Sequence, residues 1–229
     1  KFPRGKAESD RLILRNEAPY YEVARRFGLR VGAPLHYEQE TLFVPRFDRE
    51  RAGDTLLRHG LESLYSIAGI AEFGVAPSHN RLIAALAKYV DDPATELVEY
   101  VLRDLLNVAL LNTDNHGRNT ALIKRCGRVA LAPLFDFAPM FLDDSGIARV
   151  CRWEAPAEHA GIPDWGRVAE VVAPYGVDAA VLRERLAGLA DTVYTLPETL
   201  LACGADPVVA ERVSPRCENV AKHLREVGS

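Results

Sequence analysis

Asp114, Asn119 and Asp136 carry side-chain oxygens at positions whose spacing could support phosphoryl transfer. The first two lie in the polar part of LLNTDNHGRNTAL, residues 110–122, and the third follows in LAPLFDFAP. Carboxylate and amide oxygens are the ligands that Mg²⁺ prefers, and a carboxylate can take the proton of an attacking hydroxyl. We predict that Asp114 is the catalytic base and that Asn119 and Asp136 bind Mg²⁺ on the phosphate side.

The same order of residues is typical of protein kinases, in which a catalytic Asp precedes an Asn and then a metal-binding Asp. Each residue also has a purely structural interpretation. Asp114 could be a turn residue at a helix end, Asn119 a cap at the start of a strand, and Asp136 the N-cap of the next segment. Because D-x-x-x-x-N is common by chance, the rest of the chain must support the catalytic hypothesis.

The elements around the polar segment are predicted to bring the three residues together. Residues 94–111 have apolar side chains at helical spacing, and this pattern ends where the polar segment begins. Residues 120–124 and 128–132 favour two strands joined by the turn RCGR. A loop, a hairpin and a second loop in this order would bring the three oxygen-bearing side chains to one point.

The remainder of the chain divides into a short mixed part and a longer helical part. A helix is predicted over 16–29, with Asn16 as its N-cap and its end near Gly28. The other predicted elements are strands at 35–37 and 41–44, helices at 55–69 and 79–90, and helices from about 164 onwards with breaks near Gly176 and at Pro207.

This order predicts an α+β fold in two parts. Residues 1–50 would be the remainder of a small α/β lobe with a hinge, and residues 51–229 a helical lobe with one embedded hairpin. The boundary is expected near residues 48–54, in the segment DRERAGD. A cleft between the two parts would be the natural place for a ligand.

Two features of the first part could serve a nucleotide. Lys1 in KFP and Glu17 in the predicted helix could form the lysine–glutamate pair that holds ATP phosphates in kinases. Residues 44–47 lie between the two parts, where their backbone groups could bond adenine with Phe47 beside the ring. The alternatives are two solvated charges and a phenylalanine that only packs in the core.

Composition excludes several classes of protein. The 229 residues are 48% hydrophobic and 26% charged, as in an ordinary globular protein, and the net charge of −4 argues against a broad nucleic-acid surface. The four cysteines form no C-x-x-C pair, so neither a zinc site nor a disulfide framework is predicted, and a cytoplasmic location is expected. No apolar run is long enough to span a membrane, and no signal peptide is predicted from these residues.

Five motifs occur in a fixed order along the chain, namely KFP, NEAPYYEVARRFGL, FVPRFDR, NTDNHGRN and LAPLFDFAP. Together they resemble the HipA-like serine/threonine kinases of bacterial toxin–antitoxin systems, over roughly residues 1–140. The resemblance implies a bilobal protein-kinase-like (HipA-like) fold. It also implies ATP and Mg²⁺ as cofactors and a serine or threonine of a cellular protein as the phosphate acceptor, with a protein of the translation machinery as the candidate substrate.

The resemblance also assigns roles to single residues. Lys1 resembles the lysine that contacts ATP phosphates, and Glu17 its partner on a helix. The adenine-binding hinge is matched by Val44, Pro45, Arg46 and Phe47, of which Pro45 stands where the family often has an acidic residue. Asp114 is similar to the catalytic base, His116 to a loop residue on the nucleotide side, and Asn119 and Asp136 to the Mg²⁺ ligands.

Other properties of the family lead to expectations beyond the site. A Gly/Ser-rich phosphate loop, whose serine can be autophosphorylated, and an N-terminal subdomain are both missing before Lys1, so the sequence is expected to be a segment of a longer protein. The resemblance implies growth inhibition by the kinase and neutralisation by a HipB-like DNA-binding antitoxin. Three alternatives stay open: a kinase of small molecules, a nucleotide-binding regulator with weak catalysis, and a component of a DNA-binding repressor.

Overall fold

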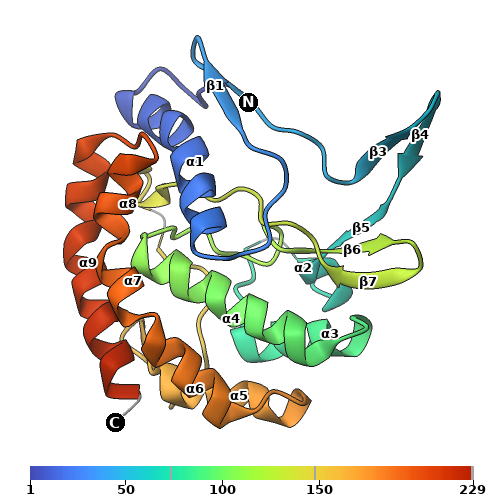
Figure 1. The fold of residues 1–229 in the computed structure, drawn as a ribbon, viewed down its shortest axis with the longest axis vertical. Helices are drawn as coiled ribbons and strands as arrows, with labels where there is room; N and C mark the ends of the chain where they lie inside the picture. Colours follow the sequence, from blue (N-terminus) through green and yellow to red (C-terminus); the bar gives the residue numbers. More distant parts are fainter. Residues whose placement is uncertain (73, 147, 228–229) are drawn as a thin grey trace.

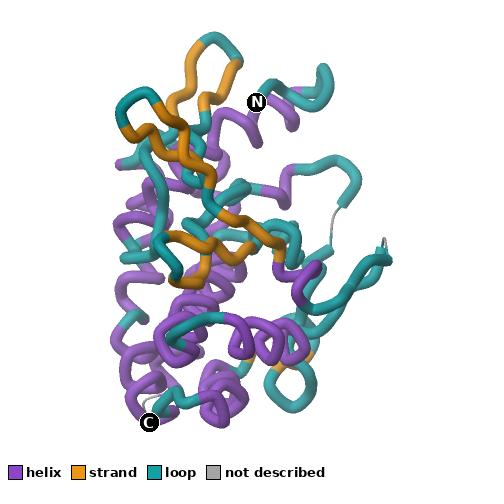
Figure 2. Tube along the Cα trace, turned by 90° about the vertical axis from the view of Figure 1, so that its right-hand side faces the viewer, coloured by secondary structure: helices purple, strands orange, loops and turns teal. Residues whose placement is uncertain are grey.

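The computed structural model describes residues 1–72, 74–146 and 148–227, and it contains helices together with small antiparallel sheets. Figure 1 shows the N-terminal helix α1 (Glu8–Arg26) beside the C-terminal helices, with the strands extending away from them. In Figure 2, most strands lie towards the end of the molecule that carries the N-terminus, and the helices continue to the end that carries the C-terminus. No helix within the described ranges is long and apolar enough to cross a membrane.

Helix α1 is longer than predicted. It begins at Glu8, has acidic residues in its first turn and arginines in its last turn, and is followed by Gly28 at φ +91°. These charges suit the helix dipole, and the left-handed glycine is typical of a helix end. The prediction of Asn16 as the N-cap is wrong: Asn16 is fully buried within the helix, where it donates a 2.7 Å hydrogen bond to Asp206 and accepts one of 2.8 Å from the backbone of Asp206.

The predicted helix at 55–69 is also wrong. The chain forms the hairpin of β3 (Arg49–Ala52) and β4 (Thr55–Arg58), then strand β5 (Gly60–Ser63), and only a single helical turn, α2 (Leu64–Ile67). Leucines at helical spacing suggested a helix, but β5 pairs with β6 (Ala121–Arg125) along its whole length. Pairing with a distant strand therefore outweighs the local helical pattern.

The two predicted pairs of strands agree with the structure. The first predicted pair forms the hairpin of β1 (His36–Glu38) and β2 (Thr41–Phe43). The second forms β6 and β7 (Arg128–Leu131), which continue the sheet in the order β5-β6-β7. Cys126 and Gly127 join β6 to β7 with φ values of +50° and +79°. Positive φ at both central residues is typical of the turn that suits the twist of a two-residue hairpin.

Helices form most of the remaining structure. The central helix α4 (Pro93–Ala109) leads directly into the polar segment, as predicted. The others are α3 (His79–Tyr89), η1 (Met140–Leu142), α5 (Trp165–Val172), η2 (Ala173–Tyr175), α6 (Ala179–Gly188), α7 (Ala190–Tyr194), α8 (Leu196–Ala202) and α9 (Pro207–Val227), and the short strands β8 (Glu158–His159) and β9 (Ile162–Pro163) precede α5. Helix α9 packs against α4, α6, α7 and α8, and it closes one side of a continuous apolar core.

Candidate active site

The polar segment of residues 112–120 forms a loop that is fixed between the end of α4 and the start of β6. Helix α4 ends at Ala109 with Leu110 as its C-cap, and Leu111 follows in the left-handed conformation at φ +55°. The backbone oxygens of Gly117 and Thr120 accept hydrogen bonds from the amides at the start of α2, at 3.2 Å from Tyr65 and 2.8 Å from Leu64. The loop is therefore supported by α2, a segment that is more than 45 residues earlier in the sequence.

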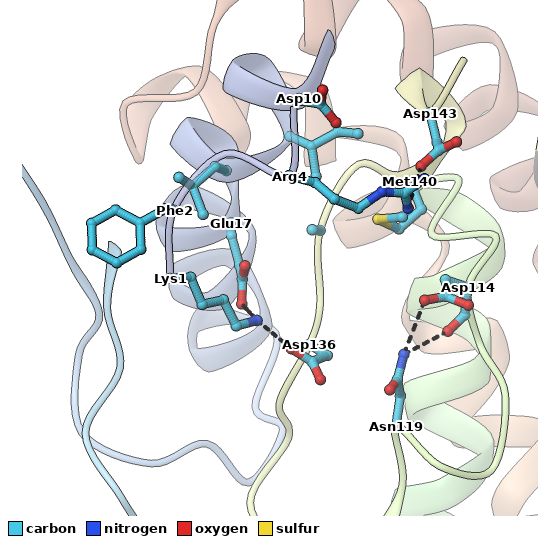
Figure 3. Close-up of a pocket in the computed structure, with 13 residues that line it drawn as sticks. Lys1, Phe2, Arg4, Asp10, Glu17, Asp114, Asn119, Asp136, Met140 and Asp143 are labelled. Atoms are coloured by element: carbon cyan, nitrogen blue, oxygen red, sulfur yellow. Dashed lines mark hydrogen bonds and ion pairs between the residues drawn. The ribbon is translucent and has the colours of Figure 1, made fainter. Parts of the chain in front are cut away.

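Asp114 and Asn119 face each other within this loop. The side-chain amide of Asn119 donates to the backbone oxygen of Asp114 at 3.0 Å and to its carboxylate at 3.2 Å, as the dashed lines in Figure 3 show. This orientation turns the Asn119 carbonyl oxygen away from Asp114. Burial raises the pKa of Asp114, although His116 and the Asn119 hydrogen bond act in the opposite direction. A raised pKa makes Asp114 a stronger base than an ordinary exposed aspartate.

Asp136 lies beyond the β6–β7 hairpin and meets the N-terminal residues. Its backbone is left-handed at φ +50°, which is uncommon outside glycine but is more accessible to aspartate than to most residues. The Lys1 ammonium forms ion pairs with both Asp136 and Glu17, at 2.7 Å from Glu17. Burial raises the pKa of Glu17 and outweighs the opposing effect of Lys1. Burial alone would lower the pKa of Lys1, but its two carboxylate partners raise it overall.

Lys1, Glu17 and Asp136 separate two cavities. The larger, of about 440 Å³, is lined by these three together with Asp114 and Asn119, and Figure 3 shows these side chains around it. The smaller, of about 210 Å³, adds mainly apolar and aromatic side chains, namely Tyr21, Leu35, Val44, Pro45, Phe47, Leu61 and Phe135, with Arg46 and Asp48. Lys1 therefore lies between a mainly apolar cavity and a charged one.

The predicted hinge residues all line the smaller cavity. Phe47 stacks near Phe135, with ring centroids 5.8 Å apart. Arg46 forms a bidentate ion pair with Asp48, with hydrogen bonds of 2.7 and 2.6 Å. The segment from Val44 to Asp48 connects β2 to β3 and so belongs to neither strand.

His116 lies beside Asp114. Its Nε2 is 3.2 Å from the Asp114 carboxylate, and its ring lies near Tyr65, with centroids 6.2 Å apart. Within the described residues, neither of the two cavities includes His116 in its lining. The geometry therefore favours a role in bracing Asp114, and contact with a nucleotide stays a prediction.

Sequence reasoning missed several lining residues. Leu35, Leu61 and Phe135 carry no chemistry that a motif search would detect, and only the fold brings them beside the hinge. Arg4 and Asp143 line the larger cavity and form a 3.1 Å ion pair across it. Arg4 is three residues after Lys1, and Asp143 is seven residues after Asp136. The closeness of these two charged residues to the motifs is the sequence signal that could have identified the pair.

The oxygen donors of the larger cavity fit a magnesium ion that is shared with phosphates. Asp136 is partly exposed in the cavity, and Asn119, whose side-chain carbonyl oxygen takes no part in the bonds to Asp114, lines the same cavity. The described residues contain no cluster of three or more His, Cys, Asp or Glu arranged to hold a metal. Mg²⁺ commonly uses one or two protein oxygens and completes its shell with water and substrate phosphates, so two protein ligands agree with this mode of binding.

Gly117 is required by the packing of the loop, which leads to a test. A Cβ at Gly117 would lie 2.2 Å from Cδ1 of Tyr65, whereas a Cβ at Gly188 would meet nothing within 4 Å. We expect Gly117→Ala to lower the free energy of unfolding by about 1–3 kcal/mol, because the buried Tyr65 ring must move. Gly188→Ala, as the control, should leave it unchanged or slightly raised. Urea denaturation of both variants measures the difference, and equal stability would show that the loop relaxes freely.

Comparison with known proteins identifies the family. A model of the HipA-like C-terminal domain matches residues 1–195. The chain belongs to this family. The family predicted from the motifs is therefore confirmed. No curated protein matches the sequence significantly.

Solved structures confirm the predicted kinase-like fold. HipA of Shewanella oneidensis MR-1, solved with HipB and its operator DNA, superposes with a TM-score of 0.71 at 17% identity, covering 94% of this chain. The proinflammatory kinase CtkA of Helicobacter pylori superposes with a TM-score of 0.56 at 13% identity, covering 100% of this chain and 90% of CtkA. The chain spans 57% of the length of that HipA chain.

Proposed function

We propose that this chain is the catalytic part of an ATP- and Mg²⁺-dependent kinase that phosphorylates serine or threonine in a protein. The observation that carries the proposal is the position of Lys1, paired with Glu17 and Asp136, between an apolar cavity and a cavity lined by Asp114 and Asn119. An adenine ring fits the chemistry of the first cavity, and phosphates with an acceptor hydroxyl fit that of the second. Membership of the HipA-like family supports the same activity.

The residues of the chain would divide the work as follows. Phe47 and Phe135 hold the adenine, and the Lys1 ammonium, oriented by Glu17, neutralises phosphate charge. The Asp114 carboxylate takes the proton of the acceptor hydroxyl, whose oxygen bonds to the γ-phosphorus while the bond to the leaving ADP oxygen breaks. Mg²⁺, bound by Asn119 and Asp136, would supply further neutralisation of the phosphates. Catalysis rests on position and electrostatics because phosphoryl transfer needs little covalent chemistry from the protein.

We further propose that residues 1–50 act as a small lobe with the hinge and residues 51–229 as the large lobe. The two cavities contain residues from both sides of this boundary, with Lys1 and Glu17 on one side and Asp114 and Asp136 on the other. A HipB-like antitoxin is the proposed partner, by analogy with the HipA complex that contains HipB and operator DNA. Growth inhibition in the cytoplasm, released by this partner, is the corresponding cellular role.

Transfer of labelled γ-phosphate tests the proposed activity. The protein is incubated with Mg²⁺, γ-labelled ATP and a bacterial lysate, and the products are separated into proteins and small molecules. We expect label in protein, recovered as phosphoserine or phosphothreonine after acid hydrolysis. Label only in small molecules would indicate a small-molecule kinase instead. Binding of ATP without any transfer would indicate a regulator and contradict the proposal.

The metal assignment leads to a second test. Asp136→Asn replaces an anionic oxygen ligand with a neutral one, so the variant should lose most of the Mg²⁺-dependent part of its ATP affinity. Wild-type protein at a hundredfold excess of Mg·ATP over Kd should gain about 2.7 kcal/mol of stability, and a thermal-shift titration measures how much of this the variant retains. Asp144→Asn, near the cavity but outside its lining, is the control. Equal Mg·ATP stabilisation of wild type and Asp136→Asn would leave Asp136 a structural residue.

A further inference from the structure

Asn115 differs from its neighbours in the polar loop because its side chain points into the protein. Only 9% of Asn115 is exposed, although the adjacent Asp114 lines the larger cavity. Its side-chain oxygen accepts hydrogen bonds from the amides of Val150 and Cys151, each at 3.1 Å. Its side-chain nitrogen donates to the Cys151 oxygen at 3.2 Å and to Asp104 at 3.3 Å. All four hydrogen-bonding positions of this amide are therefore filled.

The groups that hold Asn115 are themselves fixed. Asp104, on helix α4, is 2% exposed and accepts from Arg149 at 2.7 Å and from the Trp153 indole at 2.8 Å. Arg149 also donates to the buried Glu158 at 2.6 Å. Burial would raise the pKa of Asp104, but Arg149 and His79 outweigh burial and lower it, so the carboxylate stays charged. Asn115 thus connects the loop to a buried ion-pair cluster of Asp104, Arg149 and Glu158.

Other side chains of the loop are anchored less firmly. Thr113 Oγ1 and His116 Nδ1 are buried without a hydrogen-bond partner among the described atoms. Among the described residues, the Asn119 side chain bonds to Asp114, within the loop itself. Asn112 donates to Asn107 on α4 at 2.8 Å, and Arg118 donates to the backbone oxygen of Glu72. The hydrogen bonds of Asn115 differ in joining the residue next to Asp114 to buried groups of the interior.

We propose that Asn115 is a positioning residue, whose four hydrogen bonds hold the loop so that the Asp114 carboxylate stays at the acceptor position. The catalytic consequence rests on the proposed kinase function, whereas the positioning itself does not. Displacement of a reacting group by about 1 Å can cost on the order of 10²-fold in rate. The affinity for ATP without metal should be spared, because Lys1 and Phe47 belong to other segments.

The experiment compares Asn115→Ala with Tyr100→Phe. Tyr100 lies in the same buried region and forms a 2.7 Å hydrogen bond with His79. Tyr100→Phe removes this bond but none of the hydrogen bonds of the loop. Well below both melting temperatures, Asn115→Ala should lower kcat about 10²-fold, and its ATP affinity in EDTA should stay unchanged. Tyr100→Phe should keep both values. In an Asp114→Asn background, Asn115→Ala should lower the rate by less than about threefold, because both changes act through one group.

Hydrogen exchange at the backbone amide of Asn119, which donates to His116 at 2.9 Å, reads the loop position without any reaction. Faster exchange in Asn115→Ala but not in Tyr100→Phe supports the positioning role, even if wild-type protein transfers no phosphate and the proposed function fails. Unchanged exchange at Asn119 in Asn115→Ala overturns the proposal. An equal loss of rate in the wild-type and Asp114→Asn backgrounds also overturns it, since a general loss of structure would act independently of Asp114.

Discussion

Asp114→Asn is expected to lower the rate of phosphoryl transfer about 10²–10⁴-fold, the usual cost of losing a general base. Asparagine has nearly the same shape and can still accept the hydrogen bond that Asn119 donates to the carboxylate at 3.2 Å. The affinity for Mg·ATP should therefore change little. Single-turnover transfer and equilibrium nucleotide binding, measured on one preparation, separate the two effects.

Asp92→Asn is the matched control for this change. Asp92 caps α4 by accepting a 3.2 Å hydrogen bond from the amide of Thr95, and asparagine caps helices about as well as aspartate. The control removes the same charge far from the larger cavity and should transfer phosphate at the wild-type rate. If Asp114→Asn were equally active and merely less stable, Asp114 would be a turn residue at the end of α4, and the catalytic assignment would be wrong.

Arg149→Met is expected to lower the free energy of unfolding by about 3–5 kcal/mol, because it leaves buried charge without its partner. Arg149 forms ion pairs of 2.7 Å with Asp104 and 2.6 Å with Glu158, and both carboxylate side chains are 2% exposed. Methionine replaces the apolar stem of the arginine side chain but none of its charge. Denaturant unfolding at neutral pH measures the effect.

The same variant has a defined pH dependence. In the wild type, the folded pKa of Asp104 lies below its ordinary value, so its stabilising contribution is complete above about pH 4 and is lost as the pH falls further. In Arg149→Met, protonation of Asp104 relieves the buried charge that has lost its arginine partner, so the difference from wild type should shrink towards pH 4. Arg225→Met removes an exposed ion pair with Asp191 and should change stability little at any pH. A loss of stability that is the same at all pH values would contradict the electrostatic explanation.

The sequence predicted the parts of the site that carry motifs and regular elements. The helical pattern of 94–111, the RCGR turn and the two strands around it correspond to α4 and the β6–β7 hairpin. These local elements are sufficient to place Asp114, Asn119 and Asp136 around one cavity. The Lys1–Glu17 ion pair was also predicted, and the structure brings the two side chains to 2.7 Å.

The incorrect and missing predictions have a common physical cause, which is contact between segments that are distant in the sequence. Asn16 was mistaken for a cap because its bond to Asp206 spans 190 residues. The leucines of 55–69 were mistaken for a helix because the pairing of β5 with β6 is not visible locally. Phe135 and Leu61 line the smaller cavity through the fold alone. The role of Asn115 was equally hidden, because its partners Val150 and Cys151 lie in an irregular segment.

The proposed nucleotide site can be tested by a crystal structure of the protein with Mg²⁺ and a non-hydrolysable ATP analogue. We expect adenine between Phe47 and Phe135, phosphates beside Lys1, and one Mg²⁺ coordinated by the Asn119 carbonyl and the Asp136 carboxylate, with Asp114 facing the terminal phosphate. A nucleotide bound elsewhere, or a metal that contacts neither Asn119 nor Asp136, would contradict it.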